Sequence, residues 1–413
     1  MAAIVGRRAT DPPEPLAVVN ARALLPDGLH ERVTIVTRDG RIADVAPDGP
    51  RSALADARVI DVAGRLVTAG LVDIHVHGAA GEAFDGAGVP FESANEPIGV
   101  ATLRLLAAAG VTSVLTSLVS APVERLTGTV SALGRLASEQ RPDTAEVLGV
   151  HLEGPFLAVA QCGAHDPAAL TAPTPSAVSA LLEHRDVLRM VTLAPELPGG
   201  IDAVRRFTDA GVLVAVGHSE AGVPELAAAV DAGARHLTHL WSGQSSTVRR
   251  GPWRVPGLLE ASLASDGLTA EIIADGRHLP PTLLEIARRS LPDRLVIVSD
   301  GTPGTGMPAG YEYDLAAVRC VVADGVGMVV GVDAFGGSTT TLPQMLAHLH
   351  DDLGWPLADV VTAATSRPAA VVGVADRKGS IAVGTDADLA VFDTGFRPYG
   401  TVLRGRWLPA SGS

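Results

Sequence analysis

Cysteine and lysine are scarce in this chain of 413 residues. Its two cysteines, Cys162 and Cys320, are too few for a disulfide framework, and nothing in the sequence requires an oxidising compartment. Lys378 is the only lysine, so almost every cationic side chain is an arginine. We therefore expect a protein of the reducing cytoplasm.

Long apolar runs and an excess of positive charge are also missing. The N-terminal stretch MAAIVGRRATDPPEP has no apolar segment after its basic pair, and no later segment reaches the length of a membrane span without a charge or a glycine. The net charge of −14 argues against an extended surface for nucleic acid or anionic membranes, although a local cationic pocket remains compatible with it. We expect a small-molecule partner, with no nucleic acid and no membrane.

Aromatic residues make up only 3% of the chain, whereas hydrophobic residues make up 47% and glycines number 45. This mixture predicts a core of Val, Leu, Ala and Ile, which suits buried parallel strands between Ala-rich helices. The length exceeds that of one small domain and fits a large α/β domain with a minor partner.

Both ends of the chain have the pattern of short antiparallel strands. RVTIVTRDGRIADVAP and ARVIDVAGRLVTAG alternate apolar and polar residues around Asp-Gly and Ala-Gly turns, and GSIAVGTDADLAVFDTG and GTVLRGRWLP repeat the style. We predict one small β-sandwich domain built from both termini, residues 1–66 and 376–413.

Between these ends, residues 67–375 repeat a short apolar run that ends in polar residues and is followed by an Ala/Leu-rich helical stretch. Eight such βα units predict a (β/α)8 barrel of the TIM type, in which active sites lie at the carboxyl ends of the strands. Residues 311–338 then predict hairpins in a long excursion, followed by a helix from about Thr341. The eight runs are LVDIHVHG, VTSVLTSL, VLGVHLEG, MVTLAPE, VLVAVGHS, RHLTHLWS, EIIADGRH and RLVIVSDG.

His75 and His77 lie two residues apart at the end of the first run. The period-2 pleat of a strand points both rings to the same face, into the mouth of the barrel. Taken alone, the pair equally fits two metal ligands or two core histidines bonded to backbone carbonyls.

The other strand ends favour a metal site. Glu153 ends the third strand, and burial of its carboxylate is costly unless it meets a cation. His218 ends the fifth strand and His239 the sixth, so the three side chains can converge as a Glu/His/His site. Such a site leaves a position open for water, as catalytic zinc requires.

Asp300 ends the eighth strand and is the candidate general base, although it also fits a simple cap of the following turn. A bound metal lowers the pKa of its water toward ~7, Asp300 takes the proton, the hydroxide attacks a carbonyl, and the acid form returns the proton to a leaving amine. Two loop histidines are expected to overhang the metal. His165 would polarise the carbonyl oxygen, and His278 would bind a substrate hydroxyl or the same oxygen.

The motifs of the chain, taken in order, resemble those of the amidohydrolase superfamily and, within it, of the N-acetylglucosamine-6-phosphate deacetylases. HLEGPFL followed by GAH is fairly specific to that branch, whereas the HxH pair and the GxDADL run occur across many branches. The resemblance covers nearly the whole chain. Its motifs are DIHVHG, HLEGPFL, GAHDP, GHSEA, THLWS, IADGRHLPP, SDGTPGTGMPAG, FGGST and RKGSIAVGTDADLAVFD.

The resemblance implies a homodimer that deacetylates N-acetylglucosamine 6-phosphate with a divalent metal ion. It places the metal at Glu153, His218 and His239, the catalytic aspartate at Asp300, and the carbonyl-polarising and sugar-contacting histidines at His165 and His278. Zn²⁺, Fe²⁺, Co²⁺ and Mn²⁺ all suit such a ligand set, with zinc as our expectation. The family's substrate contacts also fall on Ala164, Ser242, Gly243, Arg254, Asp275, Phe335, Gly336 and Gly337.

One ion is the base expectation, and a second is open. Many binuclear relatives bridge two metals with a carboxylated lysine on the fourth strand, but MVTLAPE has no lysine, so this arrangement is excluded. Glu153 could bridge instead, with His75 and His77 as further ligands.

Three departures from the family pattern keep other substrates open. The run after His239 is Trp-Ser-Gly-Gln instead of an aromatic residue followed by Asn-Ala-Met, and AVAQC lacks the usual basic residues. The arginine that reaches a neighbouring subunit's phosphate matches Arg254, with Arg249 and Arg250 as rivals in the altered segment TVRRGPWRVPG. The alternatives are the N-acetylgalactosamine 6-phosphate reaction, another N-acyl compound such as an N-acyl amino acid, and a non-catalytic barrel that binds a sugar phosphate.

Overall fold

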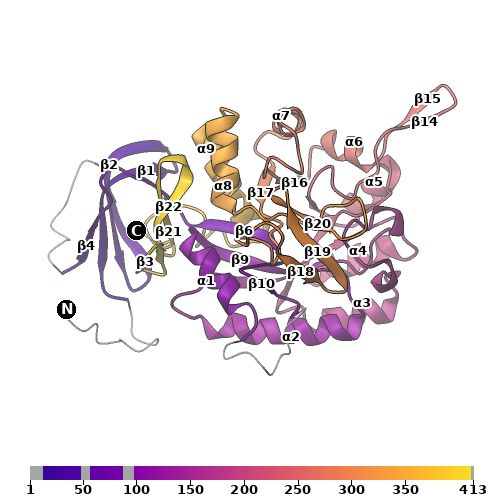
Figure 1. Ribbon diagram of the computed structural model, residues 1–413, viewed down its shortest axis with the longest axis horizontal. Coiled ribbons are helices and arrows are strands. Elements are labelled where there is room, and N and C mark those ends of the chain that lie inside the picture. Colours follow the sequence, from indigo (N-terminus) through magenta and orange to yellow (C-terminus); the bar gives the residue numbers. More distant parts are fainter. Residues whose placement is uncertain (1–12, 48–55, 87–96, 411–413) are drawn as a thin grey trace.

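Eight parallel strands form the larger unit of the computed structural model, which describes residues 13–47, 56–86 and 97–410 (Figure 1). Their spatial order follows the chain, and a bridge between Val76 and Gly301 brings the last strand against the first. The predicted (β/α)8 barrel is confirmed, and each of the eight apolar runs supplies one strand. These strands are β6 Leu71–Val76, β9 Val111–Leu118, β10 Glu146–Glu153, β11 Leu188–Leu193, β12 Leu213–Val216, β13 His236–Leu237, β16 Thr269–Ile273 and β17 Leu295–Val298.

The barrel strands are apolar because helices cover them on the outside. All residues of β6 and β9 are buried, as expected for strands covered on both faces. Helix α2 (Val123–Glu139) buries Leu126, Val130 and Leu133, which recur every three or four residues along one face. No helix among the described residues is long and apolar enough to cross a membrane. The other helices are α1 Val100–Ala108, α3 Pro175–Leu182, α4 Gly200–Asp209, α5 Val223–Asp231, α6 Leu258–Leu263, α7 Pro281–Ser290, α8 Leu342–Ala347, α9 Leu357–Ala363 and α10 Ser366–Val371.

A small three-stranded antiparallel sheet follows the eighth barrel strand, as predicted for residues 311–338. Its strands are β18 Glu312–Leu315, β19 Val318–Ala323 and β20 Val326–Val329. The hydroxyl of the buried Tyr313 donates to the carbonyl of Gly336, so this sheet fixes the FGG stretch. The predicted helix from about Thr341 is α8, for which Thr341 is the N-cap.

The second sheet combines the two ends of the chain into a β-sandwich, seen beside the barrel in Figure 1, which confirms that prediction. Strand β5 joins the halves because it pairs with β21, Ala69 opposite Leu389. The sheet therefore runs to Ala69, past the predicted boundary after residue 66, and residues 1–12, 48–55 and 411–413 of the predicted domain lie outside the described ranges. Its strands are β1 Leu16–Leu25, β2 Gly28–Arg38, β3 Arg41–Ala46, β4 Arg58–Asp61, β5 Leu66–Ala69, β21 Leu389–Asp393, β22 Arg397–Leu403 and β23 Arg406–Pro409.

The only lysine joins the two units. The buried ammonium of Lys378 lies 2.6 Å from Glu146, at the start of β10, and 3.1 Å from Asp386, and it also contacts Asp388, both of which precede β21. Burial raises the pKa of Glu146, but hydrogen bonds and charge from Arg377 and Lys378 outweigh burial and lower this pKa to about 2.

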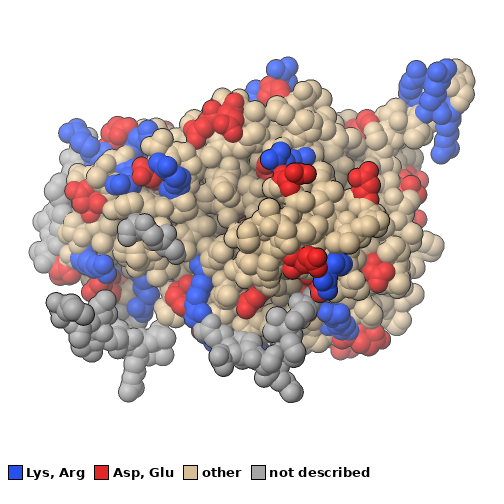
Figure 2. Space-filling model, viewed as in Figure 1, with Lys and Arg blue, Asp and Glu red and all other residues tan. Residues whose placement is uncertain are grey.

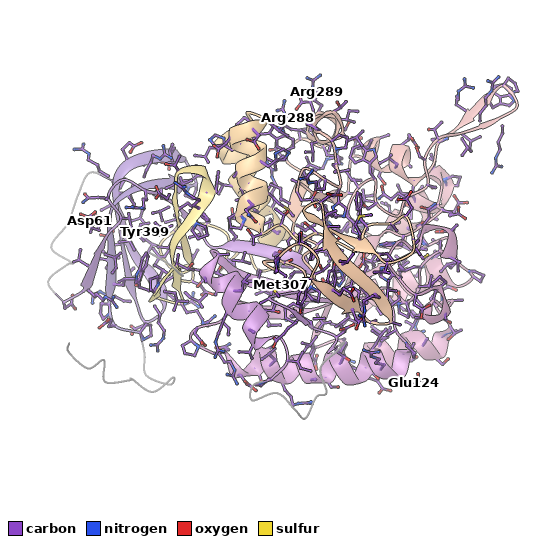
Figure 3. All side chains as sticks on the ribbon, in the orientation of Figure 1. Asp61, Glu124, Arg288, Arg289, Met307 and Tyr399 are labelled. Carbon is purple, nitrogen blue, oxygen red and sulfur yellow. The ribbon has the colours of Figure 1, made fainter. Side chains whose placement is uncertain are left out.

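We expect Lys378→Met to destabilise the fold by about 3–5 kcal/mol, because it leaves the buried carboxylate of Asp388 without its cation and Glu146 with Arg377 alone. Urea unfolding measures this change. As a control we expect Arg289→Met to change stability by less than about 1 kcal/mol, because Arg289 pairs with Glu285 on the outer side of α7 (Figure 3). A loss no larger than that of the control would contradict the role of Lys378.

The same variant should change the response to acid. The pKa of Glu146 is about 2 in the folded chain against an ordinary 4.5, so its contribution to stability is present above about pH 4.5 and is lost as the pH falls toward 2. Without Lys378 the folded pKa rises, and the drop in unfolding free energy over this window should shrink. An unchanged drop would contradict the coupling.

Candidate active site

Glu153 is the centre of the site. Its buried carboxylate ends β10, and its Oε1 lies 2.9 Å from Nε2 of His218 and 2.8 Å from Nε2 of His239. Its Oε2 lies 3.2 Å from Nε2 of His77 and 3.5 Å from Nε2 of His75. Two groups of candidate ligand atoms therefore share this carboxylate. The first group is Glu153, His218 and His239, and the second is Glu153, His75 and His77. Within each group the ligand atoms lie within 4.8 Å of one another.

The imidazoles keep the Glu153 carboxylate ionised. Burial by itself raises the pKa of this side chain, but interactions with the imidazoles of His75, His165 and His218 outweigh burial and hold the pKa well below its ordinary value. The strand-end residues thus converge as predicted. The two oxygens of the ionised Glu153 carboxylate are surrounded by ring nitrogens of the histidines.

In the first group, backbone carbonyls hold the Nδ1 atoms of the histidines and the Nε2 atoms face Glu153. Nδ1 of His218 lies 2.7 Å from the carbonyl of Gln161, and Nδ1 of His239 lies 3.2 Å from the carbonyl of Ser242. A carbonyl only accepts, so each Nδ1 carries the proton and each Nε2 is free to bind a cation. The two Nε2 atoms lie 3.2 Å apart, close to the roughly 3.3 Å that tetrahedral Zn–N bonds of about 2.0–2.1 Å impose.

In the second group only His75 is held in this way, because the buried Nδ1 of His77 has no hydrogen-bond partner among the described residues. Nδ1 of His75 lies 2.9 Å from Oε2 of Glu271, which accepts a hydrogen bond from it, and Nε2 of His75 lies 3.1 Å from Nε2 of His77. Glu271 lies on β16 and was missed by the sequence analysis. The signal was a carboxylate inside the apolar run TAEIIA, because such a group needs a buried donor.

Asp300 follows β17 and adopts φ +46°, a left-handed conformation that is uncommon for non-glycine residues. Its backbone N–H donates to the carbonyl of His75 at 2.9 Å, and its Oδ1 lies 3.4 Å from Nε2 of His77. Burial raises the pKa of Asp300, but the hydrogen bond from His77 and the neighbouring imidazole charges lower it overall. The side chain is an ionised acceptor beside both histidine groups.

His165 faces Glu153 from the loop after β10. Its Nδ1 accepts the backbone N–H of Ser120 at 3.1 Å, so the proton of the neutral ring is on Nε2, which lies 3.3 Å from Oε2 of Glu153. Burial lowers the pKa of His165 to about 4, despite the opposing effect of Glu153. The ring is therefore a neutral Nε2–H donor, and Ser120 is a second residue that the sequence analysis missed.

A pocket of about 260 Å³ opens above these groups. Its lining includes residues that the sequence analysis did not single out, among them Trp241, Thr302 and Leu315. Of the predicted site residues, His75, Asp275, Gly336 and Arg254 are not in its lining. The predicted residues that line it are His77, Glu153, Ala164, His165, His218, His239, Ser242, Gly243, His278, Asp300, Phe335 and Gly337.

Asp275 lies behind the pocket wall and orients His278. Its Oδ2 lies 2.7 Å from Nδ1 of His278, and its Oδ1 accepts the backbone N–H groups of Arg277 and His278. Burial raises the pKa of Asp275, but these hydrogen bonds lower it overall. The ring of His278 packs against Phe335 with centroids 4.6 Å apart, so both rings form one wall.

Arg254 lies on a hairpin, β14 Val248–Arg250 and β15 Trp253–Val255, that projects from the body beyond α6 (Figure 1). Basic side chains gather on this hairpin in Figure 2, and Arg249, Arg250 and Arg254 are all exposed. Within the described part of the chain, neither arginine nor lysine lines the pocket. The structure does not bring Arg254 to the pocket of its own chain.

Known proteins share this sequence and architecture. The profile of the amidohydrolase family matches residues 66–408. The N-acetylglucosamine-6-phosphate deacetylase of Homo sapiens is 32% identical over 403 residues, which cover 94% of each chain.

Two solved structures extend the comparison. The N-acetylglucosamine-6-phosphate deacetylase of Pasteurella multocida superposes with a TM-score of 0.85 at 27% identity, over 96% of this chain and 100% of that one. A mutant of the Mycobacterium smegmatis enzyme, in complex with N-acetyl-D-glucosamine-6-phosphate, gives 0.84 at 30% identity over 95% and 99%. The chain belongs to the amidohydrolase family and groups there with the N-acetylglucosamine-6-phosphate deacetylases.

Proposed function

We propose that the protein hydrolyses N-acetylglucosamine 6-phosphate to glucosamine 6-phosphate and acetate. The observation that carries the proposal is the convergence of Nε2 of His218 and of His239 on Glu153, next to an ionised Asp300 and a neutral His165. The relatives that match over most of their length bear the name of this activity, and the mycobacterial relative was solved with this sugar phosphate.

The donor set fits a divalent cation, with Zn²⁺ at Glu153, His218 and His239 as our proposal. Three nitrogen and oxygen ligands with a free fourth position are typical of catalytic zinc sites. When bound, the cation would lower the pKa of a water molecule and polarise the amide carbonyl. His75 and His77 offer a place for a second cation that shares Glu153.

The proton transfers fall to Asp300. As an ionised acceptor at the mouth of the barrel, its carboxylate takes a proton from the attacking water and then returns it to the nitrogen of the leaving amine. Because its backbone is fixed by the carbonyl of His75, the carboxylate is held in place for both transfers.

His165 stabilises the carbonyl oxygen of the substrate amide. Negative charge develops on this oxygen during attack, and the Nε2–H of the neutral ring donates to it. The fixed N–H of Ser120 on the opposite ring nitrogen keeps the proton on Nε2. The sugar lies against the wall formed by His278 and Phe335.

The phosphate is bound by the hydroxyl of Ser242, by the backbone N–H of Gly243 and by Arg254 from a second copy of the chain. The projecting hairpin supports a homodimer, because Trp253 at its end is 74% exposed and the pocket lacks an arginine of its own among the described residues. The absence of an arginine from the described pocket lining favours a second candidate substrate, an N-acyl compound without phosphate. Among phosphorylated sugars, the alternative substrate is the galactosamine epimer.

Cys162 and Cys320 are both free thiols, which supports a reducing compartment such as the cytoplasm.

Loss of a residue that hydrogen-bonds to a metal ligand weakens metal binding by about 10–100-fold. Because Glu153 is itself a proposed ligand, Glu153→Gln should weaken zinc binding by more than this. The amide keeps the size of the side chain but removes the charge and one acceptor oxygen. Titration of the metal-free protein with Zn²⁺, followed by elemental analysis, measures this. Glu225→Gln, which changes a carboxylate that caps α5, is the control, and equal zinc binding by the two variants would sink the proposed site.

Asp300→Asn should lower kcat for N-acetylglucosamine 6-phosphate by about 10²–10⁴-fold, because the amide cannot take up the proton. Acetate release by the zinc-loaded enzyme is the measurement, with bound zinc determined in parallel as the control. A variant that keeps wild-type turnover would refute the role of Asp300. No turnover of this substrate by the wild type would refute the substrate.

Arg254→Gln should raise KM for the phosphorylated sugar by about 10-fold or more, since a hydrogen bond to a charged group contributes about 1.5–3 kcal/mol. Turnover of unphosphorylated N-acetylglucosamine should not change. Matched Arg249→Gln and Arg250→Gln variants show which arginine of the hairpin acts. Equal KM values for all three variants and the wild type would exclude the hairpin from phosphate binding.

A further inference from the structure

A single carboxylate behind the site contacts both groups of candidate ligands. Glu271 on β16 is fully buried, and its Oε2 lies 2.9 Å from Nδ1 of His75. The same oxygen accepts the backbone N–H of His239 at 3.1 Å. His75 belongs to one group and His239 to the other, and the two groups share only Glu153.

The contact with His75 determines which nitrogen faces the site. An ionised carboxylate can only accept, so Nδ1 of His75 holds the proton and Nε2 presents its lone pair toward Glu153. The opposite tautomer would carry a proton on Nε2 and could not bind a cation there.

The contact with His239 determines where the backbone runs. His239 lies beyond β13, a strand of only two residues, so the sheet itself does not fix its main chain. The N–H bond to Glu271 and the adjacent bond from Leu240 N to the Glu271 carbonyl at 2.9 Å hold this segment against β16.

The other carboxylate oxygen of Glu271 has an adaptable partner. Oε1 lies 3.1 Å from Nε2 of His236, whose Nδ1 lies 2.7 Å from the hydroxyl of Thr269. With an ionised carboxylate, Nε2 of His236 donates to Oε1 and Nδ1 accepts from the Thr269 hydroxyl. Because that hydroxyl can also accept, His236 can switch to the other tautomer when a donor replaces Oε1.

We infer that Glu271 is a positioning residue that holds one cation ligand of each group, through the tautomer of His75 and the backbone of His239. This inference rests on the cation site of the proposed function and concerns the geometry of its ligands, not the substrate.

Two conservative variants separate the effect of the length of the Glu271 side chain from the effect of its charge. Glu271→Gln keeps the length of the side chain and can leave its carbonyl oxygen on His75 and His239, while its amide donates to His236 in the other tautomer. Glu271→Asp keeps the charge but is one methylene shorter and cannot reach Nδ1 of His75. If Glu271 acts by positioning, the neutral variant should therefore resemble the wild type more closely than the charged variant does.

The experiment uses the full chain, freed of metal and titrated with Co²⁺, whose visible absorption reports ligand geometry, with bound metal counted by elemental analysis. We expect Glu271→Asp to bind Co²⁺ about 10–100-fold more weakly than the wild type, with an altered spectrum, and Glu271→Gln to bind within about 3-fold with the wild-type spectrum. The control is Glu146→Gln, a carboxylate that contacts Lys378 and not the ligands, which should bind as the wild type does.

Equal Co²⁺ affinities for the Asp and Gln variants, or weaker binding by Gln than by Asp, would overturn the inference. Failure of the wild type to bind Co²⁺ at all would instead count against the cation site of the proposed function. Thermal unfolding of each variant separates loss of the fold from loss of the site, and a folded Glu271→Asp variant with the wild-type spectrum would also overturn the inference.

Discussion

The buried carboxylate of Glu153 is the constraint on which the rest of the site depends. A carboxylate at the mouth of a barrel loses its hydration, and it stays ionised only where positive charge or hydrogen-bond donors surround it. Histidines at the end of β6 and in the segments that follow β10, β12 and β13 meet it there. The closed barrel is what brings these four chain segments within about 3.5 Å of one carboxylate.

The interior of the barrel below the site is hydrogen-bonded as well as apolar. His151 contacts the hydroxyl of Thr192 at 2.8 Å and that of Ser117 at 3.0 Å, and Thr192 contacts Thr238 at 2.7 Å. Barrel interiors are more often filled by branched apolar side chains. Here side-chain bonds link β9 to β10, β10 to β11, and β11 to Thr238 beyond β13, directly beneath the candidate ligands. A shift of one strand would therefore disturb its partners on the others. This network, together with Glu271, gives the ligand nitrogens fixed directions.

The sequence was enough to predict the barrel and the converging ligands, because both follow from local pattern. Polar residues at the ends of parallel apolar strands meet at one edge whatever the details of packing, which is why Glu153, His218 and His239 could be named in advance. The acceptors behind the ligands could not be predicted. Glu271 and Ser120 are distant in sequence from His75 and His165, and only the closed barrel decides which buried donor meets which acceptor. Arg254 shows the opposite case, since a motif identified the residue but not the direction in which its hairpin projects.

The central claim is that the Nε2 atoms of His218 and His239 and an oxygen of Glu153 bind one cation. Crystals of the full chain grown with Zn²⁺ and measured at the zinc absorption edge test it directly. We expect an anomalous peak about 2.0–2.2 Å from each of these three atoms. A peak bound through Nδ1 of either histidine, or zinc bound elsewhere with none at Glu153, would contradict it.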